Sequence, residues 1–457
     1  MSSTSKYEIN MCEGKLLPKI LKFYFPIMAS GVLQLVFNAA DLMVVGNFCG
    51  DDSVAAVGST TSLINLLVNI LIGLAVGANV LVARYFGAGQ DKELEETVHT
   101  SVMTALVGGI VMCFVGIAVS HRTLVTMATP GDILPKSLLY LRLYCLGIPA
   151  SALYNFGSSV LRAVGDTKRP LYYLFTAGIL NVILNLIFVI LFRMDVAGVA
   201  CATVISQVLS AFLILRCLSK CEGAYKLEFK KLSIKKDKLL KLVGIGLPAG
   251  LQGALFSLSN IVIQSSVNSF GKIVVAGNSA AISVEGFVYM AMNGVYQCAV
   301  SFAGQNYGAG KYKRIVKLAF ICEGLVFFVG LILGNASYFF GRTLLGLYVK
   351  GDEAIHYGMV RLGVICTIYF LCGFMDTIVG VLRGMGYSII PMFVSLSGAC
   401  LFRIIWIMTV FKNHHELTWL YISYPISWIM TAAVHFMCFG IIMYRLITKK
   451  CGTEMTD

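Results

Sequence analysis

Polar side chains interrupt several long apolar segments of this 457-residue chain at helical spacing. Gln34, Asn38 and Asp41 are four and three residues apart, so a helix would place them on one face. Burial in a low-dielectric environment disfavours a charged carboxylate, so a carboxyl group such as Asp41 can bind and release a proton near neutral pH. Ion binding is therefore one interpretation of this face. The alternative is a carboxylate that caps the adjacent loop, where Asp51 and Asp52 follow.

Amide and hydroxyl groups recur in the two apolar segments that follow residue 170. Asn181 and Asn185 are one helical turn apart, and Thr203 lies in the next segment. Oxygen atoms of these types beside one carboxylate suit a hard cation such as Na⁺. Asparagines in membrane helices also form plain interhelical hydrogen bonds, so a structural role stays open. The predicted ion-coupling residues are Asp41, Asn38, Asn181, Asn185 and Thr203. We favour H⁺ over Na⁺ as the coupling ion and expect no cofactor and no other metal.

A second polar group lies in the C-terminal half of the chain. Glu285 shares a helical face with Tyr289 and Met292, and Asp376 lies deep in a later apolar segment. A negative centre with aromatic and methionine walls suits small organic cations of varied shape. The alternative is a salt bridge, for instance between Glu285 and Arg403. The predicted substrate-cavity residues are Gln34, Asn260, Gln264, Glu285, Tyr289, Met292 and Asp376.

The segments that carry these residues are long enough to cross a membrane. Of all residues 58% are hydrophobic and 13% are charged, and the mean hydropathy is +0.81. Soluble domains carry about a quarter charged residues, so this chain lacks the polar surface to stay in water. Stretches that can cross about 30 Å of hydrocarbon recur along the whole length. We predict an all-α polytopic membrane protein with twelve transmembrane helices, over residues 17–46, 54–82, 97–120, 136–161, 170–192, 196–218, 239–266, 275–303, 316–339, 355–382, 388–411 and 418–446.

The net charge of +13 is distributed unevenly over these segments. Loops on one side of the predicted membrane hold only seven Lys and Arg residues: Arg122, Lys136, Arg193, Lys272, Arg342, Lys350 and Lys412. By the positive-inside rule both termini are cytoplasmic, and no nucleic acid is needed to explain the charge. The basic cluster from Arg216 to Lys241 is interpreted as a plain cytoplasmic linker, with contact to anionic lipid headgroups as the alternative. The first fifteen residues are polar and predict no cleaved signal peptide. We expect a monomeric, multi-pass protein of a bacterial inner (plasma) membrane that contacts membrane lipids.

The chain repeats itself after about 221 residues. Leu161-Arg162-Ala163-Val164-Gly165 corresponds to Leu382-Arg383-Gly384-Met385-Gly386. Six helices per half is an even number, so both halves enter the membrane with the same orientation. They should form two pseudo-twofold-related six-helix bundles around a central cavity, as in a carrier. The predicted parts are a cytoplasmic tail (1–16), a bundle (17–220), a basic linker (221–238), a second bundle (239–446) and a second cytoplasmic tail (447–457).

Arg162 and Arg383 follow long apolar helices and precede glycine-containing turns. We interpret both as structural, because a guanidinium can neutralise the carbonyl groups at a helix C-terminus.

The motifs also resemble those of a known family. Asn38-Ala39-Ala40-Asp41-Leu42-Met43-Val44-Val45-Gly46, Gly87-Ala88-Gly89 and Leu161-Arg162-Ala163-Val164-Gly165-Asp166 are similar to the signature of MATE (multidrug and toxic compound extrusion) proteins. Gly304-Gln305-Asn306-Tyr307-Gly308-Ala309-Gly310-Lys311 and Ser423-Tyr424-Pro425-Ile426-Ser427-Trp428 fit as well. The resemblance implies a V-shaped pair of six-helix bundles. It also implies export of organic, mostly cationic compounds, driven by inward H⁺ or Na⁺.

The resemblance extends to single residues. It implies an acidic residue at Asp41 in the first helix. It also implies an Asn followed by an Asp in the fifth helix, where this chain has Asn185 at the second position. That departure removes one negative charge and puts Na⁺ binding in doubt. A second branch of the family implies acidic residues in helices 7, 8 and 10, and only Glu285 and Asp376 match here.

Other functions stay open at this point. A lipid-linked oligosaccharide or polyprenyl lipid flippase of the same superfamily would line its cavity with basic residues that bind pyrophosphate. Here the candidate residues are acidic, with Arg403 as the exception. An intramembrane enzyme is disfavoured, because His-Glu-x-x-His is absent and Gly131-Asp132 and Gly351-Asp352 lie in predicted outer loops. No P-loop is present, so the sequence favours a secondary antiporter that uses an ion gradient.

Overall fold

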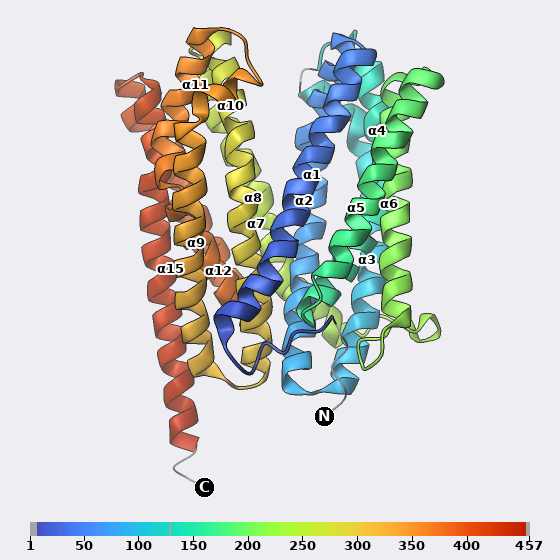
Figure 1. Cartoon of the computed structure of the whole chain (residues 1–457), viewed down its shortest axis with the longest axis vertical. Helices are drawn as coiled ribbons and strands as arrows, with labels where there is room; N and C mark the ends of the chain where they lie inside the picture. Colours follow the sequence, from blue (N-terminus) through green and yellow to red (C-terminus); the bar gives the residue numbers. More distant parts are fainter. Residues whose placement is uncertain (1–6, 128, 454–457) are drawn as a thin grey trace. The chain divides into compact units, whose positions relative to one another are not determined.

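The structure, a computed structural model, describes residues 7–127 and 129–453. These residues form twelve long helical segments and no strand (Figure 1). The first seven are α1 (Leu16–Phe48), α2 (Asp51–Ala88), α3 (Asp91–Thr126), α4 (Leu134–Ala163), α5 (Lys168–Leu186) with η1 (Ile187–Leu191), α6 (Asp195–Lys220) and α7 (Lys236–Asn268). The other five are α8 (Lys272–Gly308), α9 (Tyr312–Phe339), α11 (Asp352–Ile365) with η3 (Cys366–Ile368) and α12 (Phe370–Gly384), the run α13 (Ile389–Ser395), η4 (Leu396–Leu401), α14 (Phe402–Trp406) and η5 (Ile407–Phe411), and α15 (Leu417–Thr453). Short helices η2 (Phe229–Lys231) and α10 (Gly341–Gly346) lie in the connections.

Each of the twelve predicted transmembrane ranges corresponds to one of these segments, and ten of the ranges lie wholly inside their segments while 170–192 and 388–411 exceed theirs by one residue. The predicted fold class is therefore confirmed. Ten of the described helices are long and apolar enough to cross a membrane, and the pair α11–α12, bent by 48°, makes an eleventh. The remaining segment, α4, is 30 residues long but contains Arg142 and Arg162. Three of the twelve segments are not simple α-helices. The α5 segment ends in the π-helical turn η1, and the run from α13 contains two such turns, η4 and η5. The α11–α12 segment is broken near Tyr369.

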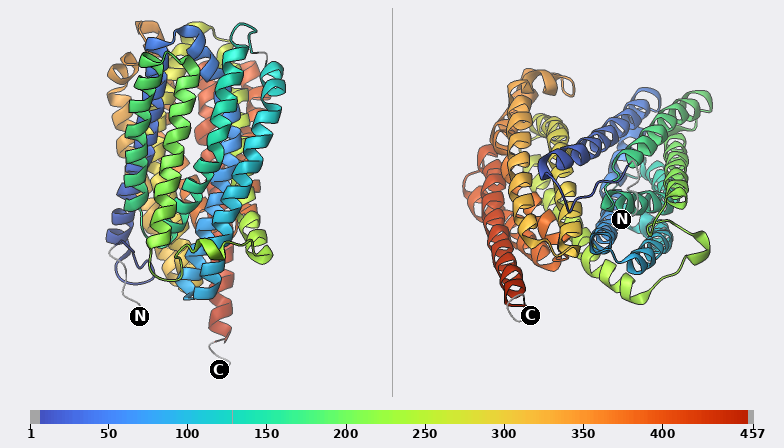
Figure 2. Two further views of the ribbon diagram at one scale, coloured as in Figure 1. Left: turned by 90° about the vertical axis from the view of Figure 1, so that its right-hand side faces the viewer. Right: turned by 60° about the horizontal axis from the view of Figure 1, so that its bottom comes forward.

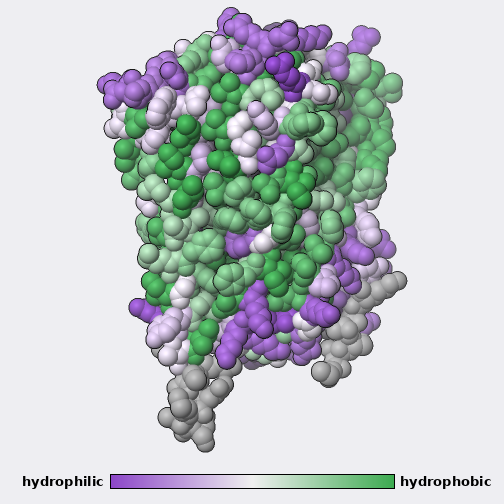
Figure 3. All heavy atoms as spheres, turned by 60° about the vertical axis from the view of Figure 1, so that its left-hand side comes forward, coloured by the Kyte–Doolittle hydropathy of each residue, from purple (hydrophilic) through white to green (hydrophobic). Residues whose placement is uncertain are grey.

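Large apolar side chains project outward from the helices. Phe114, Phe320 and Phe339 are 69%, 74% and 82% exposed. On the face drawn in Figure 3, apolar side chains cover the middle of the helices and polar ones gather toward both ends. Exposed apolar surface on this scale is stable only when hydrocarbon, rather than water, is the surrounding solvent.

The chain divides into two compact units that do not follow the order of the sequence strictly. The first contains residues 7–10 and 29–254, and the second contains residues 11–28 and 255–453. In each unit the long helices run side by side along one direction (Figure 2). The boundaries differ from the predicted bundles in one way: the first part of α1 packs in the second unit, and the first part of α7 packs in the first.

The internal repeat is visible in the backbone of equivalent turns. Gly89 ends α2 at φ 67° and Gly310 follows α8 at φ 65°. Gly165 follows α4 at φ 101°, and Gly386 follows α12 at φ 94°. A positive φ strains any residue with a Cβ atom, so glycine recurs where the two halves need the same turn.

The first part of α7 lies directly against the backbone of α2, inside the first unit. A Cβ atom on Gly73 would overlap the backbone nitrogen of Gly250, and one on Gly246 would lie 2.6 Å from the Cα of Leu74. Gly77 likewise faces the carbonyl of Leu242. Two glycine pairs at a spacing of four thus face each other, as in close helix crossings within membranes.

The equivalent contact in the second unit joins the first part of α1 to α8. The ring of Tyr24 would lie 2.9 Å from a Cβ atom on Gly294, and Phe23 and Phe302 form an edge-on pair with ring centroids 5.5 Å apart. Each unit therefore receives the start of the first helix of the other half of the sequence.

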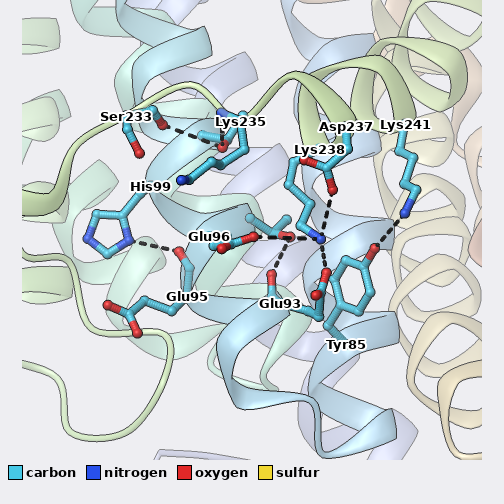
Figure 4. Close-up of polar contacts among 12 residues, drawn as sticks. Tyr85, Glu93, Glu95, Glu96, His99, Ser233, Lys235, Asp237, Lys238 and Lys241 are labelled. Carbon is cyan, nitrogen blue, oxygen red and sulfur yellow. Dashed lines mark hydrogen bonds and ion pairs between the residues drawn. The ribbon is translucent and has the colours of Figure 1, made fainter.

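The basic linker after α6 is docked on α3 rather than free. Glu228 donates its backbone N–H to Nε2 of His99 over 3.1 Å, and Lys235 donates its N–H to Thr100 Oγ1 over 3.1 Å. Lys238, only 1% exposed, forms ion pairs with Glu93 and with Asp237 and lies 4.9 Å over the ring of Tyr85 (Figure 4). The interpretation of residues 221–238 as a plain linker is therefore incomplete, because its hydrogen bonds hold it to the start of α3.

The glycine contact between α2 and α7 gives a direct test of the packing. Gly246→Ala would push a methyl group into the backbone of α2, so we expect a loss of about 1–3 kcal/mol of stability. The measurement is the thermal unfolding midpoint of the purified protein in detergent. Gly244→Ala is the matched control, because nothing lies within 4 Å of its Cβ position. Equal midpoints for the two variants would contradict the close contact.

Candidate functional site

Four of the five predicted ion-coupling residues, Asp41, Asn181, Asn185 and Thr203, come together in the first unit, from three helices. Asn185 on α5 donates from Nδ2 to Asp41 on α1 over 2.5 Å, and the same nitrogen lies 3.3 Å from Oδ1 of Asn181. Asn181 in turn donates to Oγ1 of Thr203 on α6 over 3.4 Å. Asn181 and Asn185 are buried, and Oδ1 of Asn185 has no hydrogen-bond partner in the described part of the chain. The group thus holds one carboxylate, a chain of amides and an unused amide oxygen.

A close contact between α1 and α5 sets this geometry. The ring of Phe37 occupies the space where Gly178 would carry a Cβ atom. Phe37 lies one turn before Asp41, and Gly178 lies one turn before Asn181, so the approach of the two helices brings the carboxyl and the amides together. Around the polar group lies an apolar cluster that includes Val45, Tyr140 and Val199. The carboxyl of Asp41 is partly buried beside these residues.

The two other polar residues of the predicted α1 face are not part of the group. Gln34 and Asn38 are exposed side chains, whereas Asp41 is partly buried. The helical spacing was correct, but only the carboxyl reaches the amides of α5. The assignment of Asn38 to ion coupling and of Gln34 to a substrate cavity stays a prediction.

In the second unit Glu285 forms a bidentate salt bridge, and its partner is Arg361 on α11. Nε and NH2 of Arg361 donate to the two carboxylate oxygens over 2.7 and 2.8 Å. The suggested pairing with Arg403 is wrong. Glycines let α8 and α11 approach, since a Cβ atom on Gly277 would overlap the carbonyl of Ala354. That register places Arg361, rather than Arg403, beside Glu285.

The salt bridge continues into a network of amides and a tyrosine. Oδ1 of Asn278 accepts hydrogen bonds from NH1 of Arg361 and from the hydroxyl of Tyr421, each over 3.0 Å. Asn278 donates to Gln264 on α7 over 3.0 Å, and Gln264 donates to Asn268 over 2.9 Å. The network therefore includes the predicted residue Gln264. Asn260, one turn earlier on α7, is exposed.

The predicted face of α8 contacts the α11–α12 segment over its whole length. Tyr289 hydrogen-bonds Asp376 on α12. A Cβ atom on Gly373 of α12 would lie 3.1 Å from Sδ of Met292. Arg383 donates to the hydroxyl of Tyr296 over 2.8 Å. Two tyrosines of α8 thus form hydrogen bonds with charged residues of α12.

The two arginines predicted to be structural make different contacts. Arg162 donates to Oγ of Ser159 over 3.1 Å, three residues earlier on α4. Arg383 instead links α12 to α8 through Tyr296. Although the repeat aligns the two arginines, each half uses its arginine in its own way.

Arg403 on α14 is buried against aromatic rings of α15. Its guanidinium carbon lies 4.1 Å from the ring centroid of Tyr424 and 5.8 Å from that of Trp428. Nε donates to Oγ of Ser427 over 2.9 Å. The thiol of Cys372 interacts electrostatically with Arg403, Asp376 and Glu285.

Sequence reasoning missed two residues of this unit. Arg361 was assigned to a predicted helix but not to Glu285. Glu323 on α9 was overlooked, although it is a carboxyl twelve positions into a largely apolar helix. It is 8% exposed, and neither carboxyl oxygen has a hydrogen-bond partner among the described residues. A search for lone acids within apolar segments would have found it.

The ligand chemistry of the chain is limited. No group of three or more His, Cys, Asp or Glu side chains within residues 7–127 and 129–453 could hold a metal ion. At the Asp41 group a small cation would meet a single carboxylate and neutral oxygens.

Two duplicated units of membrane-length helices with polar groups inside their packing define a polytopic membrane protein of the carrier class. The sequence profile of the MatE family matches residues 26–187 and again residues 248–409, and so it also confirms the internal repeat. The chain belongs to this family of MATE transporters, which are membrane transporters and not enzymes.

Relatives and solved structures agree with this assignment. The chain is 28% identical over 383 residues to the probable multidrug resistance protein YoeA of Bacillus subtilis, covering 82% of each chain. It is 22% identical over 406 residues to the multidrug export protein MepA of Staphylococcus aureus, covering 88% of this chain and 89% of MepA. A crystal structure of a MATE protein in complex with MaL6 superposes with a TM-score of 0.91 at 20% identity, covering 97% of this chain and 100% of that one. At that identity the superposition shows the fold alone.

The Glu285–Arg361 pair gives a prediction about stability. Arg361→Met alone leaves a buried carboxylate without its partner, and we expect a loss of about 3–5 kcal/mol. The double variant Glu285→Leu/Arg361→Met removes both charges and should lose markedly less. The measurement is the free energy of unfolding, obtained by titrating a denaturing detergent into the protein in a mild detergent. Exposed Arg342→Met is the control, and a double variant no more stable than the single one would contradict the pairing.

Proposed function

We propose that this chain is a secondary antiporter that exports organic compounds, mostly lipophilic cations, in exchange for protons. The observation that carries the proposal is the Asp41 group, a single carboxyl held by amides in an apolar surrounding. Membership of the MATE family and relatives named for multidrug resistance and export support drugs rather than lipid-linked sugars as cargo. The site of action is then the bacterial plasma membrane, with both termini in the cytoplasm.

The coupling step follows from the hydrogen bond between Asn185 and Asp41. A charged Asp41 accepts the amide N–H and holds α1 against α5. Protonation removes the charge that this bond stabilises, so the two helices lose part of their attraction. Binding of a proton therefore changes the free energy of the state in which α1 and α5 are in contact relative to the state in which they are apart. Coupling between an ion and a substrate requires such a difference between two states.

The donor set at this group favours H⁺ over Na⁺. The amide of Asn185 presents its N–H₂ side, not its oxygen, to the carboxylate. A sodium ion prefers several oxygen ligands, and Asp41 is the only carboxylate of the group. A proton needs one carboxyl oxygen.

Attraction of organic cations is assigned to Asp376 and Tyr289 in the second unit. Glu285 was predicted to supply the negative centre, but the bidentate bond from Arg361 already neutralises it. Asp376 accepts a hydrogen bond from Tyr289 and has no ion pair within 4 Å in the described part of the chain. Aromatic and thioether groups beside it adapt to varied shapes.

The proposal is tested by uptake of the cationic dye rhodamine 6G into proteoliposomes. We expect uptake when the lumen is acidic and none when only a Na⁺ gradient is imposed. Asp41→Asn should reduce gradient-driven uptake at least about tenfold, because the amide cannot release a proton. Asp51→Asn, an exposed acid at the end of the same hairpin, is the control and should retain uptake.

Two results would contradict the proposal. Full gradient-driven uptake by Asp41→Asn would remove Asp41 from the coupling step. Uptake driven by Na⁺ alone would make Na⁺ the coupling ion.

The ion preference can also be changed by design. Asn185→Asp places a second carboxylate beside Asp41 and supplies more oxygen ligands. We expect this variant to show uptake stimulated by Na⁺, measured in the same vesicles at constant pH. Asn335→Asp, an exposed amide on α9, is the control. Unchanged Na⁺ dependence in Asn185→Asp would contradict the assignment of this group as the ion site.

A further inference from the structure

We propose that Arg403 binds a carboxylate of the exported compound, so that the substrates include aromatic carboxylates and zwitterions. The inference rests on the proposed export function, but it concerns a different unit and the opposite charge. It starts from a buried guanidinium whose hydrogen-bonding capacity is not used up.

Arg403 lacks a counter-charge. It is 3% exposed, and its nitrogen NH2 is buried without a hydrogen-bond partner in the described part of the chain. No carboxylate of the described residues lies within 4 Å of it. The segments packed around it, from Ile389 to Phe411 and from Leu417 to Thr453, contain no acidic residue.

Nearby carboxylates are already engaged elsewhere. Glu285 receives two hydrogen bonds from Arg361, and Asp376 is hydrogen-bonded by Tyr289. Arg361 shows what a satisfied guanidinium looks like in this unit, since all three of its nitrogens donate to Glu285 or Asn278. Arg403 has a single such bond, to Ser427.

The guanidinium cannot relieve its charge by losing a proton, because arginine stays protonated in proteins. The faces of Tyr424 and Trp428 stabilise the cation in part and hold its plane. They leave N–H groups for an in-plane partner. A carboxylate matches the fork of an arginine with two parallel hydrogen bonds.

The surroundings specify the rest of the ligand. The rings of Tyr369 and Trp428 are tilted by 31° with centroids 5.4 Å apart, and those of Tyr424 and Trp428 meet edge-on at 5.8 Å. The faces of Tyr424 and Trp428 lie beside the guanidinium. Asp376 and Arg403 both interact electrostatically with the thiol of Cys372. An aromatic compound with a carboxylate matches the guanidinium of Arg403 and the aromatic rings beside it. A compound that also carries an amine can interact with Asp376.

The experiment compares rhodamine 19, a free carboxylate, with its ethyl ester rhodamine 6G. Their dissociation constants are measured by fluorescence anisotropy with the purified full-length protein. We expect Arg403→Gln to weaken rhodamine 19 about tenfold or more, equivalent to about 1.4 kcal/mol, and to change rhodamine 6G less than twofold. Arg403→Lys should give an intermediate loss, because an ammonium lacks the bidentate fork. Exposed Arg342→Gln is the matched control and should change neither dye.

Several results would overturn the inference. An equal effect on both dyes, or none on either, would make Arg403 structural. If Arg403→Gln does not fold, the test uses competition for the wild-type protein. Benzoate should displace rhodamine 19, and benzamide should not. Failure of benzoate to compete would contradict the inference. Displacement by chloride as effective as by benzoate would assign the site to a halide instead.

Failure of the proposed function would look different. Under the proposed function, Asp41→Asn reduces gradient-driven uptake at least about tenfold while both dyes keep their dissociation constants. If no gradient drives uptake in the wild type, the antiporter proposal fails, and the dye comparison still decides the role of Arg403.

Discussion

Charged side chains inside the helix packing of this protein are largely removed from water, and most of them are paired with other side chains of the described residues. Glu285 and Arg361 satisfy each other, Asp376 is hydrogen-bonded by Tyr289, and Asp41 is held by Asn185. Removing a charge from water costs several kcal/mol, so these pairings fix the register of the helices that carry them. The arrangement of α8 against α11 and of α1 against α5 follows from this constraint.

Glycines decide how closely the charges can approach. Gly277 lets α8 meet α11 beside the Glu285 pair, and Gly178 admits Phe37 beside the Asp41 group. The glycines of α2 and α7 hold the first part of α7 inside the first unit. Small residues thus position the polar groups, although they take no part in the chemistry.

The two halves show what duplication preserves and what it changes. Equivalent turns keep glycine at positive φ, as at Gly165 and Gly386. The polar groups diverge: the first unit has one carboxyl among amides, whereas the second has carboxyls and arginines together. Backbone geometry is shared because a turn accepts few residues, while side chains in the packing are free to specialise. Under the proposed function, the first unit handles the ion and the second handles the organic compound.

Helix positions were predictable because crossing hydrocarbon demands long apolar runs, and each of the twelve ranges lies inside a helical segment or exceeds it by one residue. The repeat was visible because glycine and proline occupy matching turns. The grouping of Asp41, Asn181, Asn185 and Thr203 was also expected from their residue types, but helical spacing places only Asn181 and Asn185 on one face, and packing brings the three helices together. Their assignment to ion coupling stays a prediction.

Pairings between helices depended on the tertiary structure. Spacing cannot say which arginine meets Glu285, because the register of α8 and α11 depends on glycine contacts and charge pairs between residues far apart in the sequence. The same holds for the exchange of the first parts of α1 and α7, and for the docking of the linker on His99 and Thr100. Local periodicity specifies the face of a helix, whereas only packing specifies what that face meets.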